Sequence, residues 1–285
     1  MTERGRLIGI GYRMLGSYSD AEDAASEALV RWYRLTDAER DAVDVPAAWL
    51  TRVVGRICLD MLGSARVRRE NYVGQWLPEP VRGLDSETSA AADPADRVAH
   101  QESVTLALLV VLESLGPAQR VAFVLHDAFA VPFDEIATVL DRSPAACRQL
   151  ASAARSHVRS RHRSVVDPIE HDRVVRAFAS ASAGGDITSL VSVLAPDVTL
   201  VSDGGGHVSA ARNAVLGSDR VARFVRGITA KPTELRWSIE PVNALSGIVI
   251  RRDGAVFGVI GFDTADSVVS SVWIVLNPDK LRHWV

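Results

Sequence analysis

The residues most able to do chemistry are a cluster of arginines just past the middle of the chain. From Arg142 to Arg163 the sequence holds six arginines and no acidic residue, a local charge of +6 in a chain whose net charge is −3. Such a concentration of cations favours binding to phosphate groups, and arginine, glutamine and serine can read base edges in the major groove. We therefore expect a nucleic-acid-binding surface here. A basic helix face that is only solvated is the alternative.

A helix-turn-helix pattern positions these arginines. The spacing predicts a short helix over Phe133–Leu140, a turn at residues 141–143 and a second helix that begins at Pro144. Ser143 is a suitable N-cap, and proline is well placed in a first helical turn. The residues that we expect to contact DNA are Arg142, Ser143, Ala145, Arg148, Gln149, Ser152 and Arg155.

A second set of basic residues borders Trp49. Apolar residues from Trp49 to Met61 repeat at helical spacing; Arg52 and Arg56 lie within this stretch and Arg66 follows it. Taken alone, this pattern is typical of a solvated helix face. Two basic helical modules in one chain make a DNA surface the stronger interpretation, because they could bind two DNA elements that lie a few turns apart.

The composition is that of an ordinary globular protein. The 285 residues are 47% hydrophobic and 24% charged, which excludes a wholly disordered chain, a collagen and a disulfide scaffold. This length predicts two or three domains. Cys58 and Cys147 lie far apart, which favours a reducing compartment, and no apolar run reaches the ~20 residues that span a bilayer. We expect a cytoplasmic protein without membrane association.

No pattern in the sequence predicts a catalytic centre, a metal site or a bound cofactor. Phosphate-binding glycine loops, paired-histidine metal motifs and serine elbows are missing. One alternative is an acid–base pair of Asp203 and His207, because histidine titrates near neutral pH and a carboxylate can orient it. The stretch from Asp203 to Gly206 is also typical of a turn that ends a strand. We therefore expect a protein that is not an enzyme.

The order of the predicted elements divides the chain into four segments. Helical patterns occupy residues 1–70 and 101–164, whereas residues 71–100 lose this periodicity and carry prolines and acidic residues, as an extended linker does. After Asp167 the pattern of apolar residues changes: two helical segments are followed by strand-like runs with hairpin turns. This order predicts an α+β domain over residues 168–285 with a mostly antiparallel sheet.

Several stretches of the sequence resemble one family. The AEDAASE stretch at residues 21–27, with Arg31 and Trp32 after it, and residues 49–54 resemble region 2 of extracytoplasmic-function (ECF) sigma factors. Residues 115–125, continuing to 134–137, resemble region 4. The chain departs from the family at His207, where lysine is common, and at Arg56, where a small polar residue is frequent. Three further motifs resemble the subgroup with a fused SnoaL-like (NTF2-like) domain, namely WLPEP at 76–80, DGGG at 203–206 and NPDKL at 277–281.

The resemblance implies a sigma factor, a subunit that binds core RNA polymerase and directs it to promoter DNA. Region 2 would open the −10 element at the helix Pro46–Leu62, where an extruded base can be held, and region 4 would read the −35 element through the helix-turn-helix. The residues implied for the −10 element are Trp49, Arg52, Arg56 and Arg66. Those implied for core polymerase are Glu22, Asp23, Glu27, Arg31 and Trp32.

The C-terminal domain is implied to be a cone-shaped α+β barrel that regulates the chain in place of a separate anti-sigma protein. Its pocket could take an unknown small ligand. We expect the apolar linker residues to dock on it, the alternative being that they pack against region 2. Two other functions stay open, a free-standing helix-turn-helix repressor and a small-molecule enzyme of the SnoaL-like type. The expected regulatory contact comprises Trp76, Leu77, Pro78, Pro80, Asp203, Gly204, Gly205, Gly206, Asn277, Pro278, Asp279 and Lys280.

Overall fold

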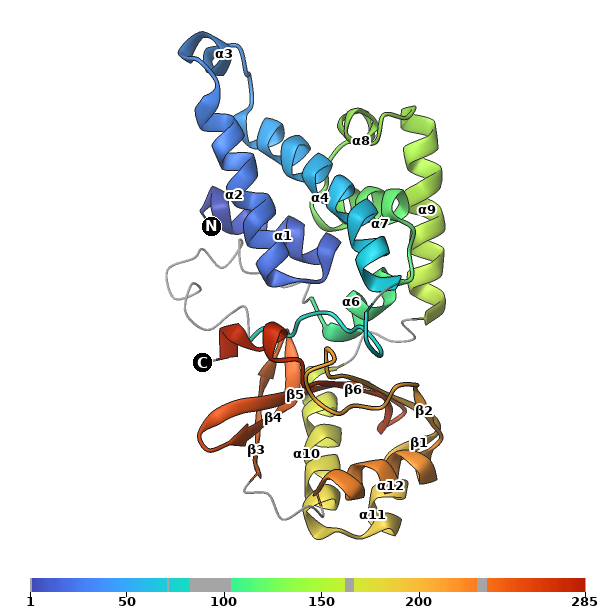
Figure 1. Cartoon of the computed structure of the whole chain (residues 1–285). Helices are drawn as coiled ribbons and strands as arrows, with labels where there is room; N and C mark the ends of the chain where they lie inside the picture. The colour runs from blue at the N-terminus through green and yellow to red at the C-terminus, as the bar shows by residue number, and fades with distance from the viewer. Residues whose placement is uncertain (1, 71, 83–103, 162–166, 230–234, 285) are drawn as a thin grey trace. The chain divides into compact units, whose positions relative to one another are not determined.

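The chain divides into a helical unit and an α+β unit (Figure 1). The computed structural model describes residues 2–70, 72–82, 104–161, 167–229 and 235–284, without the side chains of 65–70. Among these, residues up to Glu70 and from 108 to 161 form the helical unit, and residues 72–82, 104–107 and 167–284 belong to the α+β unit. The acidic part of the predicted linker, residues 83–100, lies outside the described residues.

The first helices of the helical unit are α1 (Glu3–Leu15), α2 (Tyr18–Arg34), α3 (Asp37–Asp41) and α4 (Pro46–Glu70). Ser17 is the N-cap of helix α2, and its hydroxyl accepts the N–H of Asp20 at 3.2 Å. Helices α1 and α2 approach closely at Gly11, because a Cβ there would lie 3.1 Å from Ala21.

The second half of the helical unit contains the helix-turn-helix. It comprises α6 (Leu106–Glu113), α7 (Pro117–Phe123), a π-helical turn η2 (Val124–Ala128), α8 (Phe133–Leu140) and α9 (Pro144–Arg161). The predicted turn is confirmed, since Asp141 ends α8 with φ of 52° and the Ser143 hydroxyl accepts the N–H of Ala146 at 3.2 Å.

The α+β unit is built on one six-stranded sheet in the order β2-β1-β6-β5-β4-β3, in which only β1 and β6 run parallel. Its helices are α10 (Pro168–Gly184), α11 (Ile187–Ser192) and α12 (Ser218–Thr229), and two 3₁₀ turns, η3 (Pro278–Lys280) and η4 (Arg282–Trp284), follow the sheet. The strands are β1 (Leu194–Asp203), β2 (Val215–Leu216), β3 (Leu235–Val242), β4 (Leu245–Arg252), β5 (Ala255–Ala265) and β6 (Val268–Val275).

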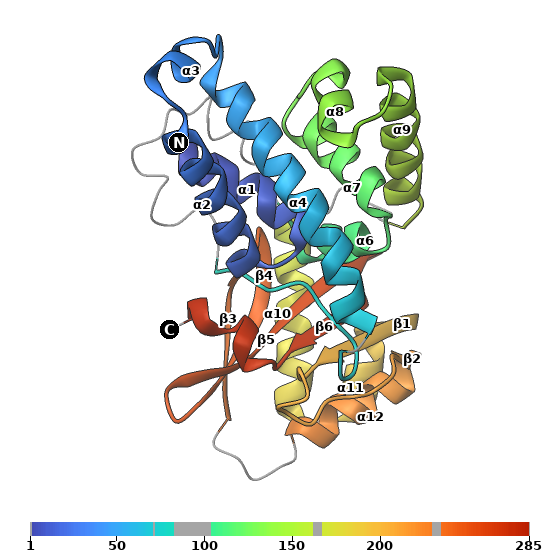
Figure 2. The same ribbon diagram turned by 45° about the horizontal axis from the view of Figure 1, so that its top comes forward.

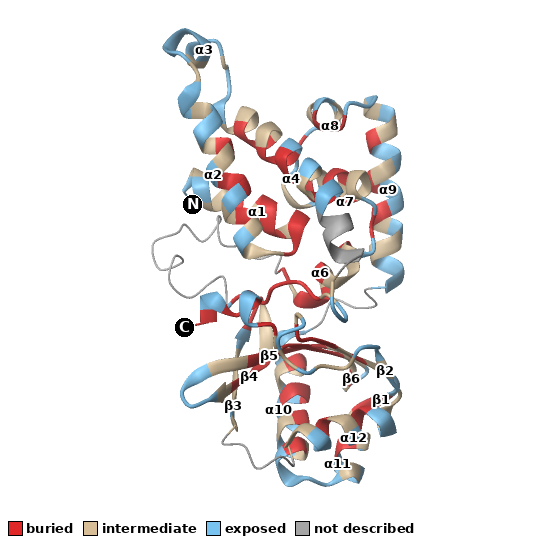
Figure 3. Cartoon of the chain, in the orientation of Figure 1, coloured by how far each residue is buried: buried red, intermediate tan, exposed pale blue. Residues whose placement is uncertain are grey.

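The core of the α+β unit lies between the sheet and its helices. Figure 2 shows the strands lying across α10, and the buried residues in Figure 3 follow the helix faces turned toward the sheet. Phe178 of α10 packs edge-to-face on Phe262 of β5 with ring centroids 5.0 Å apart. Two helical modules followed by an α+β domain is the predicted fold class, and it is confirmed. Helix α12 was not predicted, although Val221, Ala222 and Val225 carry its helical spacing.

Candidate nucleic-acid interface and linker clamp

Buried and exposed residues occupy different faces of α9. Cys147 and Ala151 are fully buried and pack α9 against the rest of the helical unit. Arg148, Gln149 and Ser152 are exposed within the first half of the helix. This face presents a guanidinium, an amide and a hydroxyl group, which are suitable for hydrogen bonds to base edges.

The other residues predicted to contact DNA differ in whether their side chains are exposed or already bound within the protein. Arg142, Ser143 and Ala145 are exposed at the start of α9. The Nε and Nη2 groups of Arg155, in contrast, donate to both carboxylate oxygens of Asp127, at 2.7 and 3.1 Å. Hydrogen bonding to Asp127 raises the pKa of Arg155. Arg155 is thus bound to η2, which its own local sequence does not indicate, because Asp127 is 28 residues away.

Two of the arginines on α4 have different surroundings. Arg52 is half-buried, whereas the exposed Arg56 donates from Nη1 to the carbonyl oxygen of Val139 on α8 at 2.9 Å. Arg56 therefore joins the region-2-like and region-4-like parts of the helical unit. The side chain of Arg66 lies outside the described residues.

Three of the predicted polymerase-binding residues on α2 form ion pairs. Glu22 accepts from Arg4 at 3.2 Å, and Glu27 accepts from Arg31 at 2.8 Å, while Asp23 is exposed. Both pairs are solvent-exposed and are therefore weak. These charges can exchange their partners for groups of another protein at little cost.

Aromatic and apolar side chains gather near the end of α2. Trp32 packs edge-to-face on Trp49 of α4, with ring centroids 5.3 Å apart. Beside it in sequence, Val30 is 40% and Tyr33 70% exposed. Our sequence analysis missed these two residues; the signal that could have found them is their position off the buried face of α2.

A buried arginine connects α7 with α1. Arg120 is only 3% exposed, and its Nη1 donates to the carbonyl oxygen of Met14 at 2.9 Å and to Glu113 at 2.8 Å. Burial lowers the pKa of Arg120 to about 10. This contact was not predicted from the sequence, because it joins residues 106 positions apart.

The carboxylate of Asp203 lies buried at the end of β1 and accepts four hydrogen bonds. The donors are the Tyr72 hydroxyl at 2.6 Å, the Leu77 N–H at 3.0 Å, the Gly205 N–H at 3.0 Å and the Lys280 ammonium at 2.6 Å. Two of these donors come from the linker. A buried carboxylate is costly unless it is paired and hydrogen-bonded, and here it is both.

Lys280 holds the linker from the other side. Its ammonium group donates to the carbonyl oxygen of Leu77 and lies 4.0 Å from the ring centroid of Trp76, a cation–π contact. The Asn277 amide donates to the Tyr72 hydroxyl at 2.8 Å. Burial, followed by the hydrogen bond to Asp203, raises the pKa of Tyr72. We call this arrangement the linker clamp: Tyr72, Trp76, Leu77, Asp203, Asn277 and Lys280.

The segment after the clamp is also bound to the α+β unit. Pro78 and Pro80 are buried, and the indole N–H of Trp284 donates to the carbonyl oxygen of Pro80 at 2.8 Å. The next carbonyl, that of Val81, accepts the N–H of Asn243 at 2.7 Å. All the described linker residues predicted to take part in the regulatory contact therefore lie against the C-terminal domain.

The glycines after Asp203 have a steric role. Gly205 adopts φ of +61°, and a Cβ there would lie 2.3 Å from the Asn277 side chain. A Cβ on Gly204 would lie 2.0 Å from the carbonyl oxygen of Val208. Gly206 also has a positive φ, of 79°. The DGGG stretch is thus a tight turn, in which Gly205 leaves room for the Asn277 side chain of the linker clamp.

The side chains of Asp203 and His207 do not form the acid–base pair that the sequence left open, because each has another partner. The Nε2 atom of His207 lies 3.4 Å from a carboxylate oxygen of Asp279, in the turn that begins at Pro278, and both side chains are more than half exposed. Among the residues that the structure describes, no group of His, Cys, Asp or Glu is arranged to hold a metal ion. Within the same ranges, none of the helices combines the length and apolar character needed to cross a membrane.

Comparison with known proteins connects both helical parts to one function. The family model described as Sigma-70 region 2 matches residues 1–68, and that described as Sigma-70, region 4 matches residues 105–158. The "ECF RNA polymerase sigma factor SigJ" of Mycobacterium tuberculosis is 42% identical over 97% of this chain and 90% of its own length. The "Probable ECF RNA polymerase sigma factor SigI" of that organism is 34% identical over 98% of this chain and 92% of its own length.

A solved structure extends the similarity to the C-terminal domain. The crystal structure of M. tuberculosis SigJ superposes with a TM-score of 0.75 at 40% identity, covering 99% of this chain and 96% of that one. The match therefore includes the linker and the α+β unit as well as regions 2 and 4. On this basis the chain belongs to the ECF RNA polymerase sigma factors, non-enzymatic subunits that direct the initiation of transcription.

Proposed function

We propose that this sigma factor is restrained by its own C-terminal domain, which takes the place of a separate anti-sigma protein. The observation that carries the proposal is the buried carboxylate of Asp203, which binds Tyr72 and Leu77 of the linker and Lys280 of the C-terminal end. Opening the clamp would free the linker and allow regions 2 and 4 to reach their promoter elements.

The spacing of the promoter elements indicates whether opening the clamp raises or lowers transcription. The −10 and −35 elements are centred about 25 base pairs apart, or about 85 Å of B-form DNA at 3.4 Å per base pair. A domain of about 150 residues is about 40 Å across. The described linker ends, 72–82 and 104–107, both belong to the α+β unit. Releasing residues 72–82 would add up to about 37 Å of extended chain, so an open clamp favours transcription.

The roles of the two helical regions follow from their exposed residues. We assign −35 reading to Arg148, Gln149 and Ser152 of α9, because all three are exposed in its first half. Trp49 and Arg52 of α4 would contact the −10 element. Glu22, Asp23, Glu27, Arg31 and Trp32 of α2 would bind core polymerase, together with the exposed Val30 and Tyr33.

In vitro transcription with core RNA polymerase and the full chain tests this proposal. Trp76→Ala removes the cation–π contact, and Asp203→Asn removes the charge that Lys280 faces. Breaking the buried ion pair costs about 3–5 kcal/mol in Asp203→Asn. Losing a desolvated cation–π contact costs about 2 kcal/mol in Trp76→Ala, so both variants should open the clamp. We expect several-fold more transcript per sigma factor, with unchanged affinity for core polymerase.

The matched control is Asp197→Asn, which changes an exposed carboxylate on the same strand. It should leave transcription at the wild-type value. Circular dichroism shows whether Asp203→Asn still folds, and Trp76→Ala keeps the test valid if it does not. Equal transcript from wild type and Trp76→Ala, or less transcript from Trp76→Ala, would exclude a restraining clamp.

A further inference from the structure

A cavity of about 820 Å³ lies in the α+β unit between the second half of α10, the end of α12 and strand β3. This volume is within the range of about 300–1,000 Å³ that small-molecule sites occupy. Its walls include Ala179 and Ala183 of α10, Arg226 of α12 and Trp237 of β3. The linker clamp uses none of these residues.

The sequence of α10 explains why this space is hollow. Up to the middle of the helix Val174, Val175 and Phe178 are buried and fill the core. After Phe178 the residues of α10 that line the cavity are small, among them Ala179 and Ala183. Opposite them Leu235, Trp237 and Ile239 alternate along β3 on one face and are only half-buried. An apolar wall that includes an indole ring is thus left partly unpacked.

The charges around the cavity favour an anion. Arg176 and Arg226 line it, and none of its described lining residues is acidic. Arg176 is already paired with Asp172, at 2.7 and 3.3 Å. Within the described part of the chain the guanidinium of Arg226 has no ion-pair partner, and it is exposed. Among the described lining residues, Arg226 is therefore the cation beside the apolar wall that no described carboxylate pairs with.

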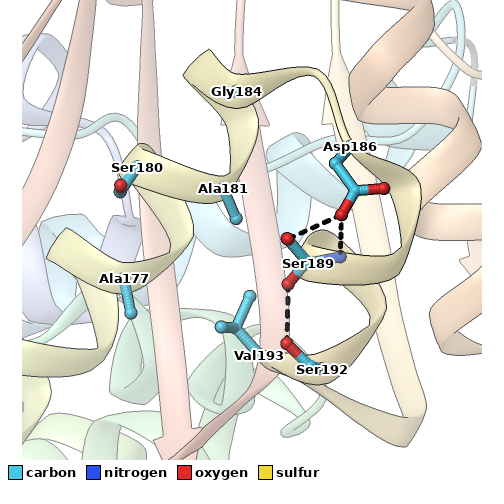
Figure 4. Close-up of a pocket in the computed structure, with 8 residues that line it drawn as sticks. All are labelled: Ala177, Ser180, Ala181, Gly184, Asp186, Ser189, Ser192 and Val193. Carbon is cyan, nitrogen blue, oxygen red and sulfur yellow. Dashed lines mark hydrogen bonds between the residues drawn. The ribbon is translucent and has the colours of Figure 1, made fainter.

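A second hollow, between α10 and α11, has a different character (Figure 4). Its polar groups bind one another: the carboxylate of Asp186 accepts the N–H and hydroxyl of Ser189, and the Ser192 hydroxyl donates to the Ser189 carbonyl oxygen. These bonds cap and close α11. The charged group of this hollow, the Asp186 carboxylate, already accepts hydrogen bonds from its own helix, which makes the cavity beside Trp237 the stronger site.

We propose that the cavity beside Trp237 binds an amphipathic organic anion, whose apolar body lies against Trp237 and whose acid group pairs with Arg226. The far end of β3 and the turn after it contact the linker, since Glu240 lies 3.4 Å from Arg82 and the N–H of Asn243 donates to the carbonyl oxygen of Val81. An occupant would therefore act on the strand that the linker contacts. This regulatory meaning rests on the proposed function, whereas the binding itself does not.

Two fluorescent probes that differ in charge test the site on the full chain. One is 8-anilinonaphthalene-1-sulfonate, and the other is N-phenyl-1-naphthylamine, which has the same rings without the sulfonate. Arg226→Gln should weaken binding of the sulfonate about tenfold, the scale of one charged hydrogen bond, and leave binding of the amine within twofold. Trp237→Ala should weaken both probes.

Arg220→Gln is the matched control, because it removes one charge from the same helix at an exposed residue that does not line the cavity. It should leave both affinities unchanged, and circular dichroism should be the same for all variants. Equal affinity of Arg226→Gln and Arg220→Gln for the sulfonate would overturn the proposal, as would the lack of saturable binding to wild type. Clamp variants that fail to change transcription would refute only the proposed function.

Discussion

Arg148 and Arg161 carry the same charge at opposite ends of α9, and they are expected to do different work. Arg148 is exposed near the helix start, with its guanidinium 5.5 Å from the ring of Phe133, while Arg161 is exposed at the last residue of the helix. Only the start of a recognition helix reaches base edges. Arg148→Ala should therefore cost about 1–3 kcal/mol on the preferred −35 sequence and relax its preference.

Arg161→Ala should weaken all promoters alike and reduce the salt dependence of binding, because a phosphate contact carries no base information. Fluorescence anisotropy of the polymerase holoenzyme on −35 variants at several salt concentrations measures both effects. If the two substitutions change the preference equally, α9 docks in another register.

His171 is the residue expected to make the α+β unit sensitive to acid. It is fully buried, accepts from the Thr264 hydroxyl at 3.1 Å and donates to the Ser246 carbonyl oxygen at 2.9 Å, which suits a neutral imidazole. Burial lowers the pKa of His171, and Ser246, Asp263 and Asp172 oppose this only in part. Below the ordinary histidine pKa of about 6.5, the unfolded chain therefore binds more protons than the folded chain does. The free energy of unfolding consequently falls as the pH drops below that value.

His171→Gln removes this titration. The melting temperature of the full chain should fall more steeply between pH 7 and pH 5 in wild type than in the variant. His207→Gln, at an exposed histidine, should behave as wild type. Parallel curves for wild type and His171→Gln would contradict the assignment.

At the scale of elements, the start of α6 is anchored in the sheet by a glycine. A Cβ added to Gly261 of β5 would lie 2.6 Å from Cδ2 of Leu106, which is 4% exposed. Gly261→Val should therefore expel Leu106, and Leu106→Ala should loosen the same contact by removing its side chain. Hydrogen exchange of the amides at 104–109 should speed up in both variants.

Combining the two substitutions tests the contact itself. The smaller alanine leaves room for the valine, so the double variant should exchange more slowly than Gly261→Val alone. Additive effects would mean that Gly261→Val disturbs β5 and not the packing of Leu106.

At the scale of the whole molecule, the bond between Arg56 and the Val139 carbonyl oxygen must break when the two regions bind elements about 85 Å apart. Dyes on Ser64→Cys and Ser156→Cys should lose energy transfer when core polymerase and promoter DNA are added. Burial raises the pKa of Cys58 to about 12 and also raises that of Cys147, so the native thiols should not label.

A pair on Ser26→Cys and Ser64→Cys, both within region 2, should keep its transfer efficiency in the same experiment. An unchanged signal from the first pair would show that the helical unit stays closed on the promoter. Membership of the sigma factor family argues against both alternatives, the free-standing repressor and the small-molecule enzyme. The energy-transfer experiment also tests the repressor directly, because a repressor would not need core polymerase to change the distance between the two dyes.

The sequence by itself determined the fold class, the helix-turn-helix and the family. These depend on local spacing: the Ser143 cap, the apolar period of α9 and the motifs at 21–27 and 115–125 are readable within a few turns of chain. The longer strands of the sheet were readable for the same reason, whereas the two-residue strand β2 was missed, and so was α12 despite its apolar spacing.

Only the tertiary structure decided which partner each charged group has. Arg155 binds Asp127, Arg56 binds the Val139 carbonyl oxygen, and Asp203 binds Lys280. An arginine that reads a base and one that holds a neighbouring helix have the same local sequence pattern. Their roles differ through contacts between residues that are 28 to 83 positions apart, and such distances are set by packing and not by periodicity.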